Sequence, residues 1–191
     1  ISVRYCNANI FISHFENEMI RKHFKIANSF VSPLAIDLET YKPKESIRRN
    51  PKLIFTISWL SIENVKRKLL VEIIQSAALV REVYPDIKFF IAGKEGTGLE
   101  TLKNAIKKFS LDTTVFILGP ISEDEKIKYL QTCAIYLQPT AVEGFGLAIL
   151  EAMACGATVI SSKRGTVPEV MGNTGLLLET HTPSEIADVI L

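Results

Sequence analysis

From residue 52 onward, apolar runs of strand length alternate with longer segments of helical periodicity. Gly or Pro follows most of these runs. Strands that alternate with helices of ten or more residues predict βαβ units and a parallel sheet. The expected strands are 53–58, 87–92, 115–118, 135–138, 158–161 and 175–178. The expected helices are 66–84, 99–109, 123–131 and 147–154, then a short helical turn after Pro168 and a last helix after Pro183.

The expected strands are apolar on both sides, which is typical of a sheet that helices cover on both faces. The predicted fold is therefore α/β: a doubly wound, Rossmann-like parallel sheet of about six strands. Such sheets bind ligands beyond the carboxyl ends of their strands. The residues that carry function are expected just after each strand.

The first 50 residues have a different character. They carry a short strand at 9–13, a helix with Ser13 as its N-cap, and an apolar element at 30–36. A polar, basic stretch with Pro43 and Pro51 follows, and such a stretch indicates a linker. We therefore expect two parts: residues 1–50 as one unit with its linker, and residues 51–191 as a self-contained domain.

Composition excludes several classes of protein. A formal net charge of +1 argues against nucleic acid as a partner, because phosphate binding needs clustered cations. The sequence contains no run of about 18 apolar residues, so no transmembrane helix is predicted. The three cysteines are widely spaced and predict buried thiols in a reducing cytosol. Because the chain starts at Ile1 without a secretory signal pattern, we expect a fragment of a longer protein.

The strongest local signal is the stretch PTAVEGFGLAILEAMACG at 139–156. Glu143 lies in a loop, and Gly144 and Gly146 precede a helix whose first amides favour anionic or hydroxyl oxygens. Glu151 lies inside this helix, where a loop position for Glu143 would let both carboxylates reach one cleft. The alternative is that Glu151 is a solvated helix residue and the glycines only form a turn.

These motifs carry a resemblance to a known family. The pattern E-GFGLAIL-E, followed by AMACGATVI and GTVPEV, resembles the retaining GT-B glycosyltransferases of family 4, also called group 1. DIKFFIAG, VFILGPISEDEK and GNTGLLLE occur in the family's order and spacing. The resemblance implies two Rossmann-like domains with a cleft between them. This chain would be the C-terminal half, and residues 1–50 the end of the N-terminal domain with the crossover between the domains.

The resemblance also implies a substrate and roles for residues. The partner would be a nucleoside diphosphate sugar, used without a metal or other cofactor. Glu143 would be the catalytic position that faces the donor sugar, Glu151 would bind the ribose hydroxyls, and Ile121 would lie at the nucleobase edge. The amides of Phe145, Gly146 and Leu147 would approach the sugar or distal phosphate, and Gly144 would also bind the donor. A glycan, lipid or other acceptor would bind to the domain that this sequence lacks.

The phosphate-binding residues depart from the family pattern. Trp59 stands where an arginine is usual, and Leu69 stands where glycine is usual. Lys68 matches the family lysine, and Arg67 could replace the missing arginine. The alternative is a solvated helix start, but cations are disfavoured at a helix N-terminus unless an anion is near, which favours phosphate binding. Gly93, Gly96 and Gly98 do not have dinucleotide-fingerprint spacing and predict a flexible turn at the rim of the cleft.

The sequence is compatible with two functions. The first is the donor-binding domain of a retaining hexosyltransferase, unable to transfer sugar alone because the other wall of the cleft is missing. The enzyme would be cytoplasmic, with peripheral docking at the cytoplasmic membrane face left open. The second is a non-catalytic domain that keeps this fold as a regulatory or interaction module. Trp59 at the usual arginine position keeps that alternative open.

Overall fold

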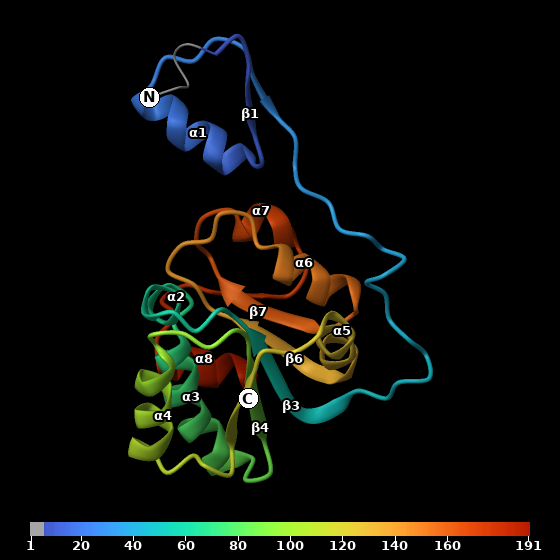
Figure 1. Ribbon diagram of the computed structural model, residues 1–191, viewed down its shortest axis with the longest axis vertical. Helices are drawn as coiled ribbons and strands as arrows, with labels where there is room; N and C mark the ends of the chain where they lie inside the picture. The colour runs from blue at the N-terminus through green and yellow to red at the C-terminus, as the bar shows by residue number, and fades with distance from the viewer. Residues whose placement is uncertain (1–5) are drawn as a thin grey trace.

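Six parallel strands form one sheet in the order β5-β4-β3-β6-β7-β8 (Figure 1). This computed structural model describes residues 6–191. The strands are β3 (Asn50–Ile57), β4 (Lys88–Ala92), β5 (Val115–Gly119), β6 (Cys133–Gln138), β7 (Thr158–Ser162) and β8 (Leu176–Leu178). The strand order reverses between β3 and β6, so the topological switch point lies between the ends of these two strands.

Helices cover both faces of the sheet, which confirms the predicted doubly wound α/β fold (Figure 1). One face packs against α3 (Leu70–Val83), α4 (Leu99–Lys108) and α8 (Pro183–Ile190). The other packs against α5 (Glu123–Thr132), α6 (Leu147–Ala154) and α7 (Val167–Met171). Consecutive residues of β3 serve both sides: Ile54 belongs to the first core and Phe55 to the second. Ser122 and Glu125 form the predicted capping box of α5.

The single helix expected at 66–84 is wrong, because the chain breaks it at Leu69. Ser61 caps an earlier helix, α2 (Ile62–Arg67), and α3 begins only at Leu70. Leu69 adopts a left-handed conformation with φ of 51°, where a residue without a Cβ is least strained. Its buried side chain offsets that strain. Lys66 and Arg67 therefore lie in the last turn of α2, not at a helix start as expected.

The glycines after β4 serve close packing of backbone, which corrects the expectation of a flexible turn. A Cβ on Gly93 would lie 1.8 Å from the carbonyl oxygen of Ser58. A Cβ on Gly96 would lie 2.9 Å from the Leu60 carbonyl oxygen. The Gly98 amide donates to that Leu60 oxygen at 2.9 Å. The loops after β3 and β4 thus form one packed layer at the carboxyl edge of the sheet.

The first segment forms a small unit with β1 (Asn9–Phe11) parallel to β2 (Ser29–Val31) and α1 (His14–His23) between them. The Ser13 hydroxyl accepts from the Glu16 amide, which confirms the predicted cap. The expected apolar element at 30–36 is shorter, because strand pairing ends at Val31, ahead of Pro33. The carboxylate of Glu169 in α7 accepts from the first two amides of α1.

Residues 37–49 lead into β3, which begins at Asn50, and Tyr41 packs against the core on the second face of the sheet. The guanidinium of Arg49 donates to the carbonyl oxygens of Leu130, Cys133 and Cys155. These contacts hold the segment against α5, β6 and α6. Cys133 and Cys155 are buried, as expected, but Cys6 is exposed, which corrects the expectation for the third cysteine.

We predict that Gly93→Ala lowers the free energy of unfolding by about 3 kcal/mol, because the new methyl group collides with the Ser58 carbonyl and the backbone has a φ of 140°. The matched control is Gly144→Ala, where an added Cβ meets nothing within 4 Å and the change should stay within about 0.5 kcal/mol. Urea unfolding followed by circular dichroism measures both. Equal effects would contradict the packed layer of loops.

Candidate functional site

The loop after β6 is fixed from both sides. The Thr140 amide donates to the Ser162 hydroxyl at 2.9 Å, which ties the loop to the end of β7. The Ala141 amide donates at 2.8 Å to the carbonyl oxygen of Arg67, which ties it to the end of α2. The Thr140 hydroxyl donates to the carbonyl oxygen of Val142 and so closes the turn. These bonds hold Glu143, which follows Val142 in the same loop, in a defined place beside the switch point.

Glu143 is buried, with 8% of the residue exposed, and its carboxylate faces three polar side chains. Lys68 forms an ion pair with Oε2, and the Gln138 amide donates to the same oxygen at 3.0 Å. Arg67 Nη1 lies 3.6 Å from Oε1. The structure thus brings together three of the predicted residues: Glu143, Lys68 and Arg67.

The charge balance at this cluster is one anion against two cations. Burial lowers the pKa of Lys68, and the attraction of the Glu143 carboxylate acts in the opposite direction. The Arg67 guanidinium is more open to solvent, with 39% of its side chain exposed. The cluster therefore carries an excess of positive charge beside the switch point, a favourable place for an anionic group.

The loop that follows β7 supports the backbone of Glu143. A Cβ on Gly165 would lie 2.4 Å from the Glu143 carbonyl oxygen, so only glycine allows this approach. The Thr166 hydroxyl donates to the carbonyl oxygen of Phe145 at 3.1 Å. Gly165 and Thr166 are the first two residues of the GTVPEV motif. The motif therefore contributes to the site by holding the loop before α6 in place.

The start of α6 has open space where a ligand would approach. A Cβ on Gly144 would meet nothing within 4 Å, and Gly146 is the N-cap with a left-handed φ of 96°. The Phe145 side chain is buried and anchors the turn, and α6 begins at Leu147. The first amides of a helix have no partners within it, so this end of α6 offers hydrogen-bond donors and the positive end of the helix dipole.

Glu151 belongs to a second cluster, built around Lys126. The Lys126 ammonium lies 2.9 Å from the Glu151 carboxylate and 2.7 Å from that of Glu123. It also lies 5.0 Å from the centre of the Tyr41 ring, whose hydroxyl donates to Glu123. The alternative of a solvated Glu151 is wrong, since 14% of its side chain is exposed. That both glutamates reach one cleft stays a prediction.

Electrostatics of this second cluster favour the paired state. Burial, together with the hydrogen bond to Glu123, raises the pKa of Tyr41 to about 12. Burial acts to lower the pKa of Lys126, but its bonds to Glu123, Tyr41 and Glu151 outweigh this and raise it above the ordinary value. The cluster joins the segment 37–49 to α5 and α6.

Two other predicted positions lie apart from these clusters. The Trp59 side chain is exposed, and the Lys94 ammonium lies 5.6 Å from its ring centre. Ile121 is partly buried in the turn between β5 and α5, against the second core. Within residues 6–191, no three metal-ligating side chains gather where a metal ion could be held.

Sequence reasoning missed four residues that shape the site. Gln138 and Thr140 flank the end of β6, Ser162 ends β7, and Lys126 lies on α5. Only Gln138 left a signal, as a polar residue that ends an otherwise apolar strand. The other three residues act through contacts between elements that are distant in sequence, and local sequence patterns do not predict such contacts.

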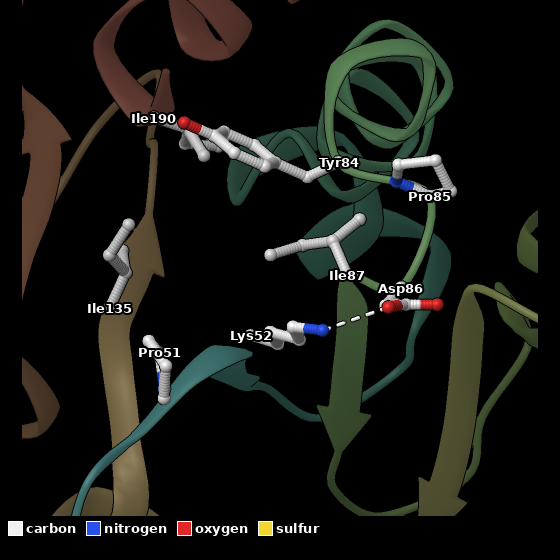
Figure 2. Close-up of a pocket in the computed structure, with 8 residues that line it drawn as sticks. All are labelled: Pro51, Lys52, Tyr84, Pro85, Asp86, Ile87, Ile135 and Ile190. Carbon is white, nitrogen blue, oxygen red and sulfur yellow. Dashed lines mark hydrogen bonds and ion pairs between the residues drawn. The ribbon is translucent and has the colours of Figure 1, made fainter.

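A separate pocket of about 410 Å³ lies at the opposite, amino edge of the sheet (Figure 2). Its walls are mainly apolar, and Lys52 pairs with Asp86 across its floor at 2.8 Å. It contains none of the predicted site residues. The lining residues are Pro51, Lys52, Tyr84, Pro85, Asp86, Ile87, Ile135 and Ile190.

The chain belongs to the family described as "Glycosyl transferases group 1", which it matches over residues 37–191. It is 33% identical over 186 residues to a subunit of phosphatidylinositol N-acetylglucosaminyltransferase from Arabidopsis thaliana, covering 95% of this chain and 40% of the relative. It is 32% identical over 155 residues to N-acetyl-alpha-D-glucosaminyl L-malate synthase of Bacillus anthracis, covering 80% and 38%. The chain thus spans about two fifths of the length of these relatives.

Solved structures share this fold. TarM from S. aureus, in a complex with UDP, aligns with a TM-score of 0.85 and 24% identity, covering 100% of this chain and 37% of that one. The C-terminal domain of a glycosyl transferase group 1 family protein from Francisella tularensis aligns with a TM-score of 0.67 and 27% identity, covering 81% and 85%. The chain is therefore a Rossmann-like domain of the kind that forms the C-terminal half of a GT-B fold. Among the described helices, none has the length and apolar character needed to cross a bilayer.

We predict that the Tyr41 hydroxyl stabilises the fold in a pH-dependent way. The folded-state pKa, about 12, lies above the ordinary value of about 10, so this stabilisation is complete below pH 10 and is lost as the pH rises through 12. The difference in unfolding free energy between wild type and Tyr41→Phe should shrink over this window. Urea unfolding at several pH values measures it, with half-exposed Tyr84→Phe as the control. A difference that stays constant with pH would contradict the paired cluster.

Proposed function

We propose that this chain is the donor-binding domain of a retaining glycosyltransferase that takes a hexose from a nucleoside diphosphate sugar. The observation that carries the proposal is the buried Glu143 carboxylate with Lys68 and Arg67 against it, beside the open N-terminal end of α6. Two cations and a helix N-terminus suit a diphosphate, and a fixed carboxylate suits sugar hydroxyls. Family membership supports the class of reaction.

The proposed roles follow from the position of each group. Lys68 and Arg67 neutralise the diphosphate leaving group, aided by the amides of the turn from Gly144 through Leu147. Glu143 accepts hydrogen bonds from the donor sugar close to the reacting carbon. Glu151 accepts from the two ribose hydroxyls, and the backbone around Ile121 lies at the base.

The proposed chemistry is a front-side displacement with retention. The acceptor oxygen forms a bond to the anomeric carbon as the bond from that carbon to the phosphate oxygen breaks. The acceptor proton passes to the departing phosphate, so the protein supplies no nucleophile. Charge grows on the diphosphate during this step, so Lys68, Arg67 and the helix amides stabilise the transition state more than the ground state, with no metal required.

The rest of the enzyme is also a proposal. Residues 1–50 would be the end of an N-terminal domain and the crossover, and that domain would bind the acceptor. Relatives whose names include phosphatidylinositol support a lipid acceptor. The proposed location is the cytoplasm, at a membrane face. Exposed Trp59, at the position of the usual arginine, favours the second candidate: a non-catalytic module with this fold.

We predict selective binding of one nucleotide, with UDP and UDP-N-acetylglucosamine as first probes because relatives are named for N-acetylglucosaminyl transfer. Ligand-observed NMR against UDP, GDP, ADP and CDP measures it. Glu151→Ala should weaken binding at least tenfold, since it removes a charged acceptor of two hydroxyl groups. Asp86→Ala, which removes a paired carboxylate at the opposite edge, should leave it unchanged. Binding of no nucleotide would contradict the proposal and favour the non-catalytic module.

We also predict that residues 1–191 bind the donor without transferring it. Transfer needs the acceptor and a closed, water-free cleft, and both depend on the other domain. The measurement is release of UDP from UDP-N-acetylglucosamine over hours, with the protein in excess of its dissociation constant. Sustained turnover by this chain would contradict the assignment of its role to donor binding alone.

A further inference from the structure

Gln138 is an unusual residue for its place. It ends β6 on the buried side of the site, with 1% of the residue exposed, directly before the loop that carries Glu143. The three residues before it are apolar or aromatic, and a leucine there would complete an apolar strand. A buried amide is costly unless both of its ends are hydrogen-bonded.

Both ends of this amide are bonded, and the bonds have a direction. The Tyr136 hydroxyl donates to Gln138 Oε1 at 2.6 Å, and Gln138 Nε2 donates to Glu143 Oε2 at 3.0 Å. An ionised carboxylate only accepts, so the amide must turn its NH₂ group toward Glu143 and its oxygen toward Tyr136. Tyr136 is fully buried and packs against Phe55, so the start of the chain of bonds is rigid.

The chain of bonds decides which carboxylate oxygen remains for a ligand. Gln138 and Lys68 both donate to Oε2 of Glu143. Oε1 faces the more exposed Arg67 at 3.6 Å, beyond hydrogen-bond distance. Because both of these donors are bonded to Oε2, Oε1 is the carboxylate oxygen left with hydrogen-bond capacity for a ligand.

We propose that Gln138, oriented by Tyr136, is a positioning residue that fixes the Glu143 carboxylate so that Oε1 accepts from a hydroxyl group of the donor sugar. This inference rests on the proposed function and deepens it. It assigns recognition of the sugar, as distinct from the nucleotide, to a buried relay, by which we mean the chain of hydrogen bonds from Tyr136 through Gln138 to Glu143. Lys68 alone cannot do this, because a flexible ammonium holds charge but leaves the plane of the carboxylate free.

The test compares UDP with UDP-N-acetylglucosamine by calorimetry on the whole chain, because only the second ligand carries a sugar. Gln138→Met keeps the length of the side chain and removes both hydrogen bonds. It should weaken UDP-N-acetylglucosamine at least tenfold and change UDP less than twofold. Tyr136→Phe frees the amide to rotate and should give a smaller loss, three- to tenfold, with the same selectivity.

Gln131→Leu is the matched control, because Gln131 is also buried and donates from its amide, but to the Lys42 carbonyl oxygen outside the site. It should affect both ligands equally. Thermal unfolding of each variant checks the fold, and if Gln138→Met does not fold, Gln138→Asn, which is one methylene too short to span the relay, carries the test.

Glu143→Gln tests the proposed function separately from the role of Gln138. If it leaves the preference for the sugar nucleotide unchanged, the proposed role of Glu143 is wrong and the inference fails with it. If it weakens UDP-N-acetylglucosamine selectively while the Gln138 and Tyr136 variants weaken both ligands equally or neither, the relay is overturned and the proposed function stands.

Discussion

The buried ion pair between Lys68 and Glu143 joins two parts of the chain that lie 75 residues apart. Each charge stabilises the other here, because removing one partner of a buried ion pair costs on the order of 3–5 kcal/mol. The break between α2 and α3 at Leu69 places the lysine, and the loop after β6 places the glutamate. The carboxyl edge of the sheet is therefore organised around one pair of opposite charges, and a ligand that brings its own anion would compete for the lysine.

The sequence predicted the fold well because its signals are local. Alternating strand and helix patterns, the Ser122 cap and the proline-rich linker each follow from neighbouring residues. The one wrong helix shows the limit of this reasoning. Periodicity runs unbroken across Leu69, and only the left-handed backbone at that leucine divides the segment into α2 and α3. A leucine gives no warning of such a conformation, whereas a glycine would have done so.

The candidate site was predicted in part. Glu143, Arg67 and Lys68 were expected to act on one ligand and do lie together. Gln138, which bonds to Glu143, was missed although it is a polar residue at the end of an apolar strand, and Lys126 was missed because it reaches Glu151 from another helix. Such contacts depend on how elements pack. The glycines of GKEGTG are another case in which packing decides. Their number suggested a flexible turn, but the structure shows that they are needed for close packing against the loop after β3.

The most direct measurement is a crystal structure of this chain with UDP-N-acetylglucosamine bound. We expect a phosphate oxygen within hydrogen-bond distance of the Lys68 ammonium, a sugar hydroxyl on Oε1 of Glu143 and ribose hydroxyls on Glu151. A donor bound in the pocket at the amino edge, or at the carboxyl edge with Glu143 and Lys68 still paired only to each other and away from the ligand, would contradict it.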